Sequence, residues 1–301
     1  MPIQQILLKG YGGLPVSWYG DRGVFAGGYA PNTNVMEYIT ITSTGNVTDF
    51  GDLPQDSRAP APASNGSRGL FMGGRSTSPG PDTQVNYITI GTTGNASDFG
   101  DSTTNAGKGY AAGAAGSTGR ALLAGGNGVS GTVDIEYFTI ATTGNGTDLA
   151  DLALSRYGLA GCSNGTRAVF GGQRTGDYID YKAIDTTANC TQFGSLEYDK
   201  GYIGGGQNDP GGRGFFSGSN GNPGISYITI DTPANSVDFG DAAGNTDATS
   251  ATSNATRGII GGSYATSTNV INYITISSVG DATDFGDLSA NRGLIGATSG
   301  N

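Results

Sequence analysis

Short apolar runs, each bounded by glycine or small polar residues, recur along the whole chain. The clearest is a strand of the type Tyr-Ile-Thr-Ile, followed by a Thr-Gly-Asn turn and a Thr-Asp-Phe-Gly-Asp segment. Its leading tyrosines are spaced 44 to 50 residues apart and are Tyr38, Tyr87, Tyr137, Tyr181, Tyr227 and Tyr273. No stretch shows the 3.6-residue apolar period of an amphipathic helix. The pattern therefore predicts an all-β chain built from six copies of one unit.

A second phrase precedes each copy: an arginine, a short apolar run and a glycine pair. The arginines are Arg22, Arg68, Arg120, Arg167, Arg213 and Arg257. Because a guanidinium group carries five N–H donors, we expect each arginine to form hydrogen bonds between adjacent units. A ring of arginines around an anion is the alternative.

Each unit divides into four short strands. In the fourth copy these strands span residues 156–162, 167–170, 178–184 and 190–196, with turn residues between them. A meander of four antiparallel strands is the blade of a β-propeller, in which neighbouring blades stack face to face. The first strand of each unit is rich in glycine and alanine, which suits the crowded axis of such a ring. We therefore predict a six-bladed β-propeller with four-stranded antiparallel blades.

The two ends of the chain bear on how this ring closes. Residues 292–300 repeat the first-strand phrase found at residues 156–165, yet they follow the last complete unit. We expect this C-terminal segment to lie inside residues 22–28 as the innermost strand of the first blade. Residues 14–19 are the alternative for that strand. With the C-terminal closure, residues 1–21 form an N-terminal arm and residues 22–301 form the propeller.

The repeat resembles the kelch repeat, in which a strand ending in Gly-Gly is followed by a strand led by Tyr. The glycine pairs here are Gly27-Gly28, Gly73-Gly74, Gly125-Gly126, Gly171-Gly172 and Gly261-Gly262, and the fifth copy has Ser217-Gly218. The fourth strand carries Phe or Leu where kelch units usually have Trp. The sequences of the Thr-Gly-Asn turn and of the acidic Thr-Asp-Phe-Gly-Asp segment also resemble repeats in structural proteins of marine tailed phages, especially cyanophages.

Composition and charge exclude several classes of function. The chain has 25 acidic and 15 basic residues, for a net charge of −10, which argues against nucleic acid and anionic membrane partners. It contains no apolar run long enough to cross a membrane and no secretion signal. With only two cysteines we expect synthesis in a reducing cytosol, which the phage resemblance implies is the host cytoplasm. Cys162 and Cys190 are the only thiols. We expect both to be small buried residues too far apart for a disulfide.

Candidate chemistry is sparse. The absence of histidine removes the commonest general base and the imidazole metal ligands. An Asp-x-x-Asp pair closes five of the six units: Asp49/Asp52, Asp98/Asp101, Asp148/Asp151, Asp238/Asp241 and Asp284/Asp287. Because a catalytic site occurs once, the repetition indicates a structural role, with carboxylates accepting N–H bonds at turns; Ca²⁺ binding is the alternative. We predict no catalytic, cofactor or metal site.

Function is expected where the repeat is broken, in the arm and in the variable loops after the glycine pairs. The phage resemblance implies a non-enzymatic virion structural protein on a capsid or tail, with other virion proteins as partners. The arm would attach it, through a strand formed by Gln4, Gln5, Ile6, Leu7 and Leu8 and a contact made by Trp18. The alternative is a module of a tail appendage that binds a receptor or host surface glycan.

Overall fold

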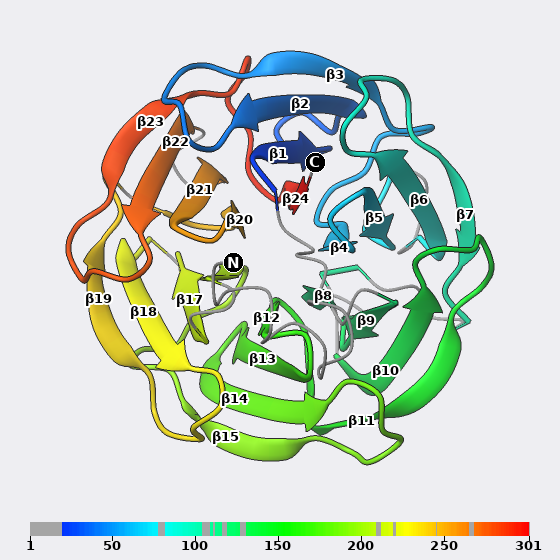
Figure 1. Ribbon diagram of the computed structural model, residues 1–301, viewed down its shortest axis with the longest axis vertical. Coiled ribbons are helices and arrows are strands. Elements are labelled where there is room, and N and C mark those ends of the chain that lie inside the picture. Colours follow the sequence, from blue (N-terminus) through cyan, green and yellow to red (C-terminus); the bar gives the residue numbers. More distant parts are fainter. Residues whose placement is uncertain are drawn as a thin grey trace, which may run out of the picture.

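The computed structural model of the protein describes residues 20–77, 82–103, 109–110, 112–115, 119–126, 131–208, 212–218, 221–244, 246–264 and 268–300. These residues form six four-stranded antiparallel sheets, arranged as blades around a central axis (Figure 1). No helix occurs within these ranges. The predictions of an all-β chain and of a six-bladed propeller are confirmed.

Every blade has the same strand order from the axis outwards. The innermost strands are β24 (Gly296–Gly300), β4 (Ala61–Ser64), β8 (Ala112–Ala115), β12 (Ala160–Ser163), β16 (Gly204–Asn208) and β20 (Ser250–Ser253). Next come β1 (Arg22–Ala26), β5 (Arg68–Met72), β9 (Arg120–Ala124), β13 (Arg167–Gln173), β17 (Arg213–Ser217) and β21 (Arg257–Ser263). The third strands are β2 (Val35–Thr40), β6 (Gln84–Thr89), β10 (Thr132–Thr139), β14 (Gly176–Ala183), β18 (Gly224–Thr229) and β22 (Thr268–Thr275). The outermost are β3 (Thr48–Asp52), β7 (Ser97–Asp101), β11 (Thr147–Arg156), β15 (Thr191–Ser195), β19 (Val237–Asp241) and β23 (Thr283–Asp287).

The C-terminal strand closes the ring. β24 pairs antiparallel with β1, with Gly300 opposite Arg22 and Gly296 opposite Ala26. Blade 1 is therefore β24-β1-β2-β3, and blades 2 to 6 follow in chain order. The predicted closure by residues 292–300 is confirmed, while the alternative strand at residues 14–19 lies outside the described residues.

Small residues at the axis are required by close packing of the innermost strands. Gly113 of β8 shows this most clearly, because a Cβ atom there would lie 2.0 Å from the Pro62 carbonyl oxygen of β4. A contact this short has no room for any side chain. The glycine-rich and alanine-rich phrase of the first strands thus reflects how closely they approach one another.

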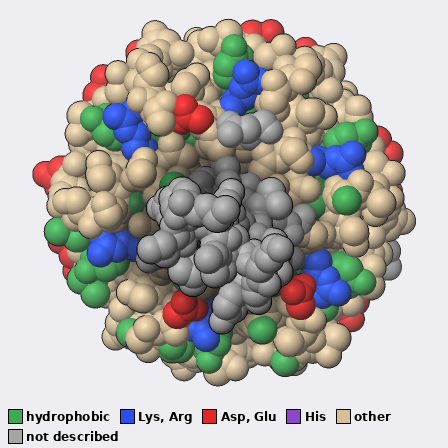
Figure 2. Space-filling view, viewed as in Figure 1, with side chains coloured by type: hydrophobic (Ala, Val, Ile, Leu, Met, Phe, Trp, Pro, Cys, Tyr) green, Lys and Arg blue, Asp and Glu red, His purple; other side chains and the backbone are tan. Residues whose placement is uncertain are grey.

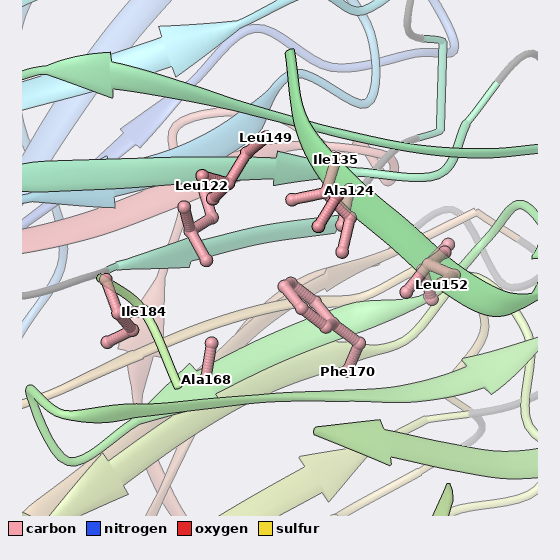
Figure 3. Packing of buried hydrophobic residues seen from close by; sticks show 10 residues of the cluster. Leu122, Ala124, Ile135, Leu149, Leu152, Ala168, Phe170 and Ile184 are labelled. Atoms are coloured by element: carbon pink, nitrogen blue, oxygen red, sulfur yellow. The ribbon is translucent and has the colours of Figure 1, made fainter. Parts of the chain in front are cut away.

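The hydrophobic core is divided into six clusters, one between each pair of neighbouring blades. Between blades 3 and 4, Leu122, Ile135 and Leu149 pack against Ala168 and Phe170 (Figure 3). Each blade therefore buries both of its faces. This explains why apolar and polar residues do not alternate cleanly along the strands.

The Thr-Gly-Asn turn of each blade docks on the outermost strand of the preceding blade. In blade 1, Gly45 N–H donates to the Phe285 carbonyl of β23 at 2.8 Å. The Asn46 side-chain oxygen accepts the Asp287 N–H at 3.1 Å. The same side-chain bond pairs Asn95 with Asp52, Asn145 with Asp101, Asn189 with Asp151, Asn235 with Ser195 and Asp281 with Asp241. All six outermost strands are thus tied to the next blade.

The glycine of the Phe-Gly-Asp phrase makes this docking possible. Gly286 has a φ of +150°, and a Cβ atom there would lie 2.3 Å from the Gly45 carbonyl oxygen of the docked turn. The β-bulge between Ile271 and Asn272 lies at the same place in the pairing of β22 with β23. The glycine is needed both for its backbone conformation and for the approach of the neighbouring blade.

Replacing Gly286 with alanine is expected to destabilise the fold by about 2 kcal/mol or more, since the new methyl group must push the docked turn away. Gly144→Ala is the matched control, because a Cβ atom at Gly144 would have no neighbour within 4 Å. Urea unfolding of both variants checks this. Equal stability of the two variants would show that the approach at Gly286 is unimportant.

Two buried ion pairs lie where the chain passes from one blade to the next. Arg156 donates to the Asp180 carboxylate at 2.7 Å, with both side chains fully buried. Arg292 pairs with Glu37 in the same way in blade 1. Blade 2 has Ser57 and Asn86 at the equivalent positions, and both are also buried.

Blade 5 places a lysine at this junction. Lys200 is fully buried, and its ammonium group donates to the Gly224 carbonyl at 2.6 Å. Burial lowers the pKa of Lys200 to about 8. The junction therefore accepts an ion pair, a lysine bonded to a carbonyl, or neutral polar residues.

Asp180→Ala is expected to cost about 3–5 kcal/mol of unfolding free energy, because it leaves the Arg156 charge buried without its partner. The double variant Arg156→Ser with Asp180→Asn copies the residues of blade 2 and removes both charges. We expect it to recover at least about half of that loss. Urea unfolding of the single and double variants measures this, and a double variant no more stable than Asp180→Ala would contradict it.

Candidate functional site: the two mouths of the ring

Two small cavities lie along the axis of the ring. One of about 70 Å³ lies at one mouth of the ring, and one of about 50 Å³ lies towards the other. The first is lined by apolar residues and tyrosines, including Pro60, Tyr110, Tyr202 and Leu294. The second is lined mostly by serine, threonine and glycine. Each has room for only a few water molecules.

A collar of backbone hydrogen bonds surrounds the first mouth. Six equivalent residues, where the chain enters each innermost strand, have φ between +52° and +74°: Ala59, Tyr110, Gly158, Tyr202, Ala248 and Leu294. Four of them donate an N–H to the preceding blade: Gly158 to Tyr110, Tyr202 to Gly158, Leu294 to Ala248 and Ala59 to Leu294, at 2.6–2.8 Å. The collar holds the inner ends of the blades together.

Serine hydroxyls link the innermost strands at the opposite end. Ser64 donates to the Ser299 carbonyl at 2.7 Å, and Ser299 donates to the Ser253 carbonyl at 2.6 Å. Ser253 in turn donates to the Gln207 carbonyl at 2.7 Å. These side chains are used in contacts between blades, so the polar lining of the second cavity serves the architecture.

The repeated arginines surround this second mouth at the start of each second strand. Arg213 lies over the Tyr227 ring of its own blade, with the guanidinium carbon 4.2 Å from the ring centroid. It also donates to the Ile276 carbonyl of the next blade at 2.8 Å. The same bond joins Arg22 to Ile90, Arg68 to Ile140, Arg167 to Ile230 and Arg257 to Ile41. Basic side chains spaced around this face lie beside hydrophobic ones (Figure 2).

These arginines are half-buried rather than buried, and they join blades as expected from their five donors. Arg120 is the exception, since it stacks on Tyr137 and pairs with Asp185 of the next blade at 3.8 Å. In the other five, the cation–π contact and the bond to a carbonyl fix the guanidinium beside a protein partner. The arginine ring thus joins neighbouring blades, as expected.

The acidic pairs lie on the outermost strands. The first aspartate of each pair is exposed, and the backbone N–H of the second donates to the turn docked from the neighbouring blade. The bonds that recur here therefore involve the backbone, whereas the sequence led us to expect the carboxylates. Within the described ranges, no group of three or more His, Cys, Asp or Glu side chains is placed to hold a metal ion.

One group of side chains at the apolar mouth does not follow the repeat. The rings of Tyr110 and Tyr202 meet edge to face with centroids 5.1 Å apart, and Tyr157 meets Tyr202 at 6.1 Å. Arg174 donates to the Tyr157 hydroxyl at 3.0 Å. We call Tyr110, Tyr157, Tyr202 and Arg174 the tyrosine cluster. Burial raises the pKa of the Tyr202 hydroxyl to about 12, with a further contribution from Tyr157, so it stays protonated at neutral pH.

A smaller aromatic group lies where blade 1 meets blade 6. Tyr29 and Tyr264 have ring centroids 5.3 Å apart, and the Arg58 guanidinium lies 4.5 Å from the Tyr29 centroid. Tyr29 also bonds through its backbone to Gly293. This group joins two blades, whereas Tyr110 and Tyr202 of the tyrosine cluster line the cavity.

The sequence did not single out the tyrosine cluster as a site. Tyr110 and Tyr202 occupy the same position of the repeat two units apart, where other units have Ala, Gly or Leu. That departure from the repeat was the available signal. The predicted contact residues Gln4, Gln5, Ile6, Leu7, Leu8 and Trp18 lie outside the described residues, as do parts of the variable loops.

No family model matches the chain, and no curated protein matches it. Within the described residues, no helical segment has the length and apolar character needed to cross a membrane.

Both cysteines are free thiols of low reactivity. Cys162 is buried and Cys190 is half-buried. Burial raises the pKa of each thiol to about 12. The thiolate is the reactive form, so neither side chain offers a nucleophile at neutral pH.

We expect iodoacetamide to alkylate the folded protein at pH 8 at least about a hundredfold more slowly than the unfolded chain, since a raised pKa leaves little thiolate. Intact-mass spectrometry over time, with and without urea, measures both rates. Similar rates in the two conditions would show that the thiols are exposed and ionised in the folded state.

Proposed function

We propose that this protein is a non-enzymatic structural protein of a phage virion. In this proposal the propeller is displayed on the capsid or tail, attached through the N-terminal arm, and other virion proteins are its partners. The support from sequence is the resemblance of the repeat to kelch units and to structural proteins of marine tailed phages. The protein would be made in the host cytoplasm and act in the virion.

The observation that carries the proposal is the use of the repeated polar residues. The arginines, the turn asparagines and the backbone of the acidic pairs all join one blade to the next. In such a scaffold the repeated polar groups form hydrogen bonds between blades and are not gathered at one reactive site. This arrangement suits a display role better than a catalytic one. Its departures from the repeat are then the places where a partner would bind.

Deletion of residues 1–20 tests this role. Antibodies against the purified propeller should label intact particles in electron microscopy, and the deletion should abolish incorporation while leaving a folded, soluble propeller. A full-length Gly144→Ala variant serves as the control and should be incorporated normally. Absence of the full-length protein from purified particles would refute the virion role, and incorporation of the deleted form would refute attachment through the arm.

A second candidate function is a receptor- or glycan-binding module of a tail appendage. The tyrosine cluster favours it, because among the described residues this group of aromatic and polar side chains occurs once, and two of its members, Tyr110 and Tyr202, line a cavity. The two functions are compatible, since a displayed propeller can also bind a host surface.

A further inference from the structure

The collar residues at the apolar mouth have equivalent backbones but different side chains. All six adopt the left-handed conformation, and Ala59, Gly158, Ala248 and Leu294 show that a tyrosine ring is not needed for it. Bulky side chains are uncommon in this conformation. The collar therefore does not explain why tyrosine occurs at Tyr110 and Tyr202.

The tyrosine cluster combines apolar rings with polar groups at one edge. Tyr110 and Tyr202 line the 70 Å³ cavity, and all three tyrosines are half-buried, so part of each ring faces solvent. At the outer edge, the exposed Arg174 guanidinium holds the Tyr157 hydroxyl at 3.0 Å. Aromatic walls with a few fixed polar groups are typical of binding sites for small ligands.

The cluster lies on the face opposite the arginine ring. Strand β13 begins at Arg167, beside the end of β12 at Ser163, whereas Tyr157 precedes the other end of β12. The loops after the glycine pairs leave the strands on this same face, because Gln173 ends β13 there. The tyrosine cluster and the strand ends from which the variable loops leave thus lie on one face, opposite the arginine ring.

The chemistry of the cluster selects among ligand classes. A quaternary ammonium group would favour aromatic rings, but the Arg174 charge at the edge opposes a cation. The net charge of −10 opposes nucleic acid. A pyranose ring has an apolar C–H face that can stack on a tyrosine ring. Its rim of hydroxyl groups can exchange hydrogen bonds with the Arg174 guanidinium and tyrosine hydroxyls.

We propose that Tyr110, Tyr157, Tyr202 and Arg174 bind one pyranose unit of a glycan at the surface of the mouth, outside the small cavity, with the sugar face on a solvent-facing tyrosine ring and its hydroxyls towards Arg174 and Tyr157. This inference rests on the second candidate function and names its ligand class and residues. It does not depend on where the protein sits in a particle.

Saturation-transfer difference NMR on the full-length protein tests it, with methyl pyranosides of glucose, galactose, mannose, N-acetylglucosamine and glucuronic acid as probes. At least one should show saturable binding, at about millimolar dissociation constant for a single sugar unit. Tyr202→Ala and Arg174→Ala should each weaken it about tenfold or more. Tyr157→Phe should also weaken it, because it keeps the ring and removes the hydroxyl that Arg174 contacts.

The controls separate binding from folding. Tyr202→Ala copies the alanine found at the equivalent positions 59 and 248, so the collar should form, and an unchanged melting temperature verifies this. Tyr198→Ala removes a tyrosine that is 44% exposed and outside the cluster, and Arg58→Ala removes the arginine stacked on Tyr29. Both should bind the sugar normally.

Three results would overturn the inference: no pyranoside binds, binding persists unchanged in Tyr202→Ala, or tetramethylammonium binds at the cluster in preference to the sugars. All are read on the purified protein and leave the particle-labelling result unaffected. A negative sugar result with labelled particles would leave a structural virion protein without this binding site.

Discussion

The contact between neighbouring blades is the constraint on which the structure depends. A four-stranded blade has two apolar faces, and each of the six core clusters contains residues from two blades. An isolated blade would leave both faces in water, so the blades become stable only as a closed ring. Closure is achieved by pairing β24 with β1, which joins the last residues of the chain to the first described strand. Each blade is therefore stabilised by its two neighbours, and its stability depends on the ring being closed.

Directional bonds add specificity to this apolar contact. At the rim, the asparagine turn reaches the outermost strand of the preceding blade. At one face an arginine reaches the carbonyl of the next blade, and at the axis serines and the collar connect the innermost strands. These bonds lie at different distances from the axis, so they fix the angle between blades as well as their separation. Because several kinds of bond join neighbouring blades, Arg120 can pair with Asp185 where the other arginines bond to a carbonyl, and the arrangement of the blades is unchanged.

Much of the fold was predictable from the sequence, because the repeated residues determine the strands and turns in which they lie. Tyr-Ile-Thr-Ile marks the third strand, glycine pairs end the second, and the phrase at residues 292–300 reveals the closing strand. The docking of Asn46 on Asp287 was not predictable, because it joins residues far apart in the chain and depends on how two blades are rotated. The role of the Phe-Gly-Asp glycine was hidden for the same reason. The sequence period predicts the strands of one blade. The contacts that set how one blade lies against the next form only in the assembled ring.

The candidate site was harder to predict because it is defined by departures from the repeat. Tyr110 and Tyr202 each resemble a strand-leading aromatic when read in one unit, and Tyr157 lies one position earlier in its own unit. Only the ring brings these three residues from blades 3, 4 and 5 to one mouth, where Tyr202 touches both of the others. In a near-symmetric scaffold, a residue that recurs six times is explained by the six equivalent contacts it makes. A residue that breaks the symmetry at a position where alanine suffices needs another explanation, and the proposed ligand at this mouth would provide one.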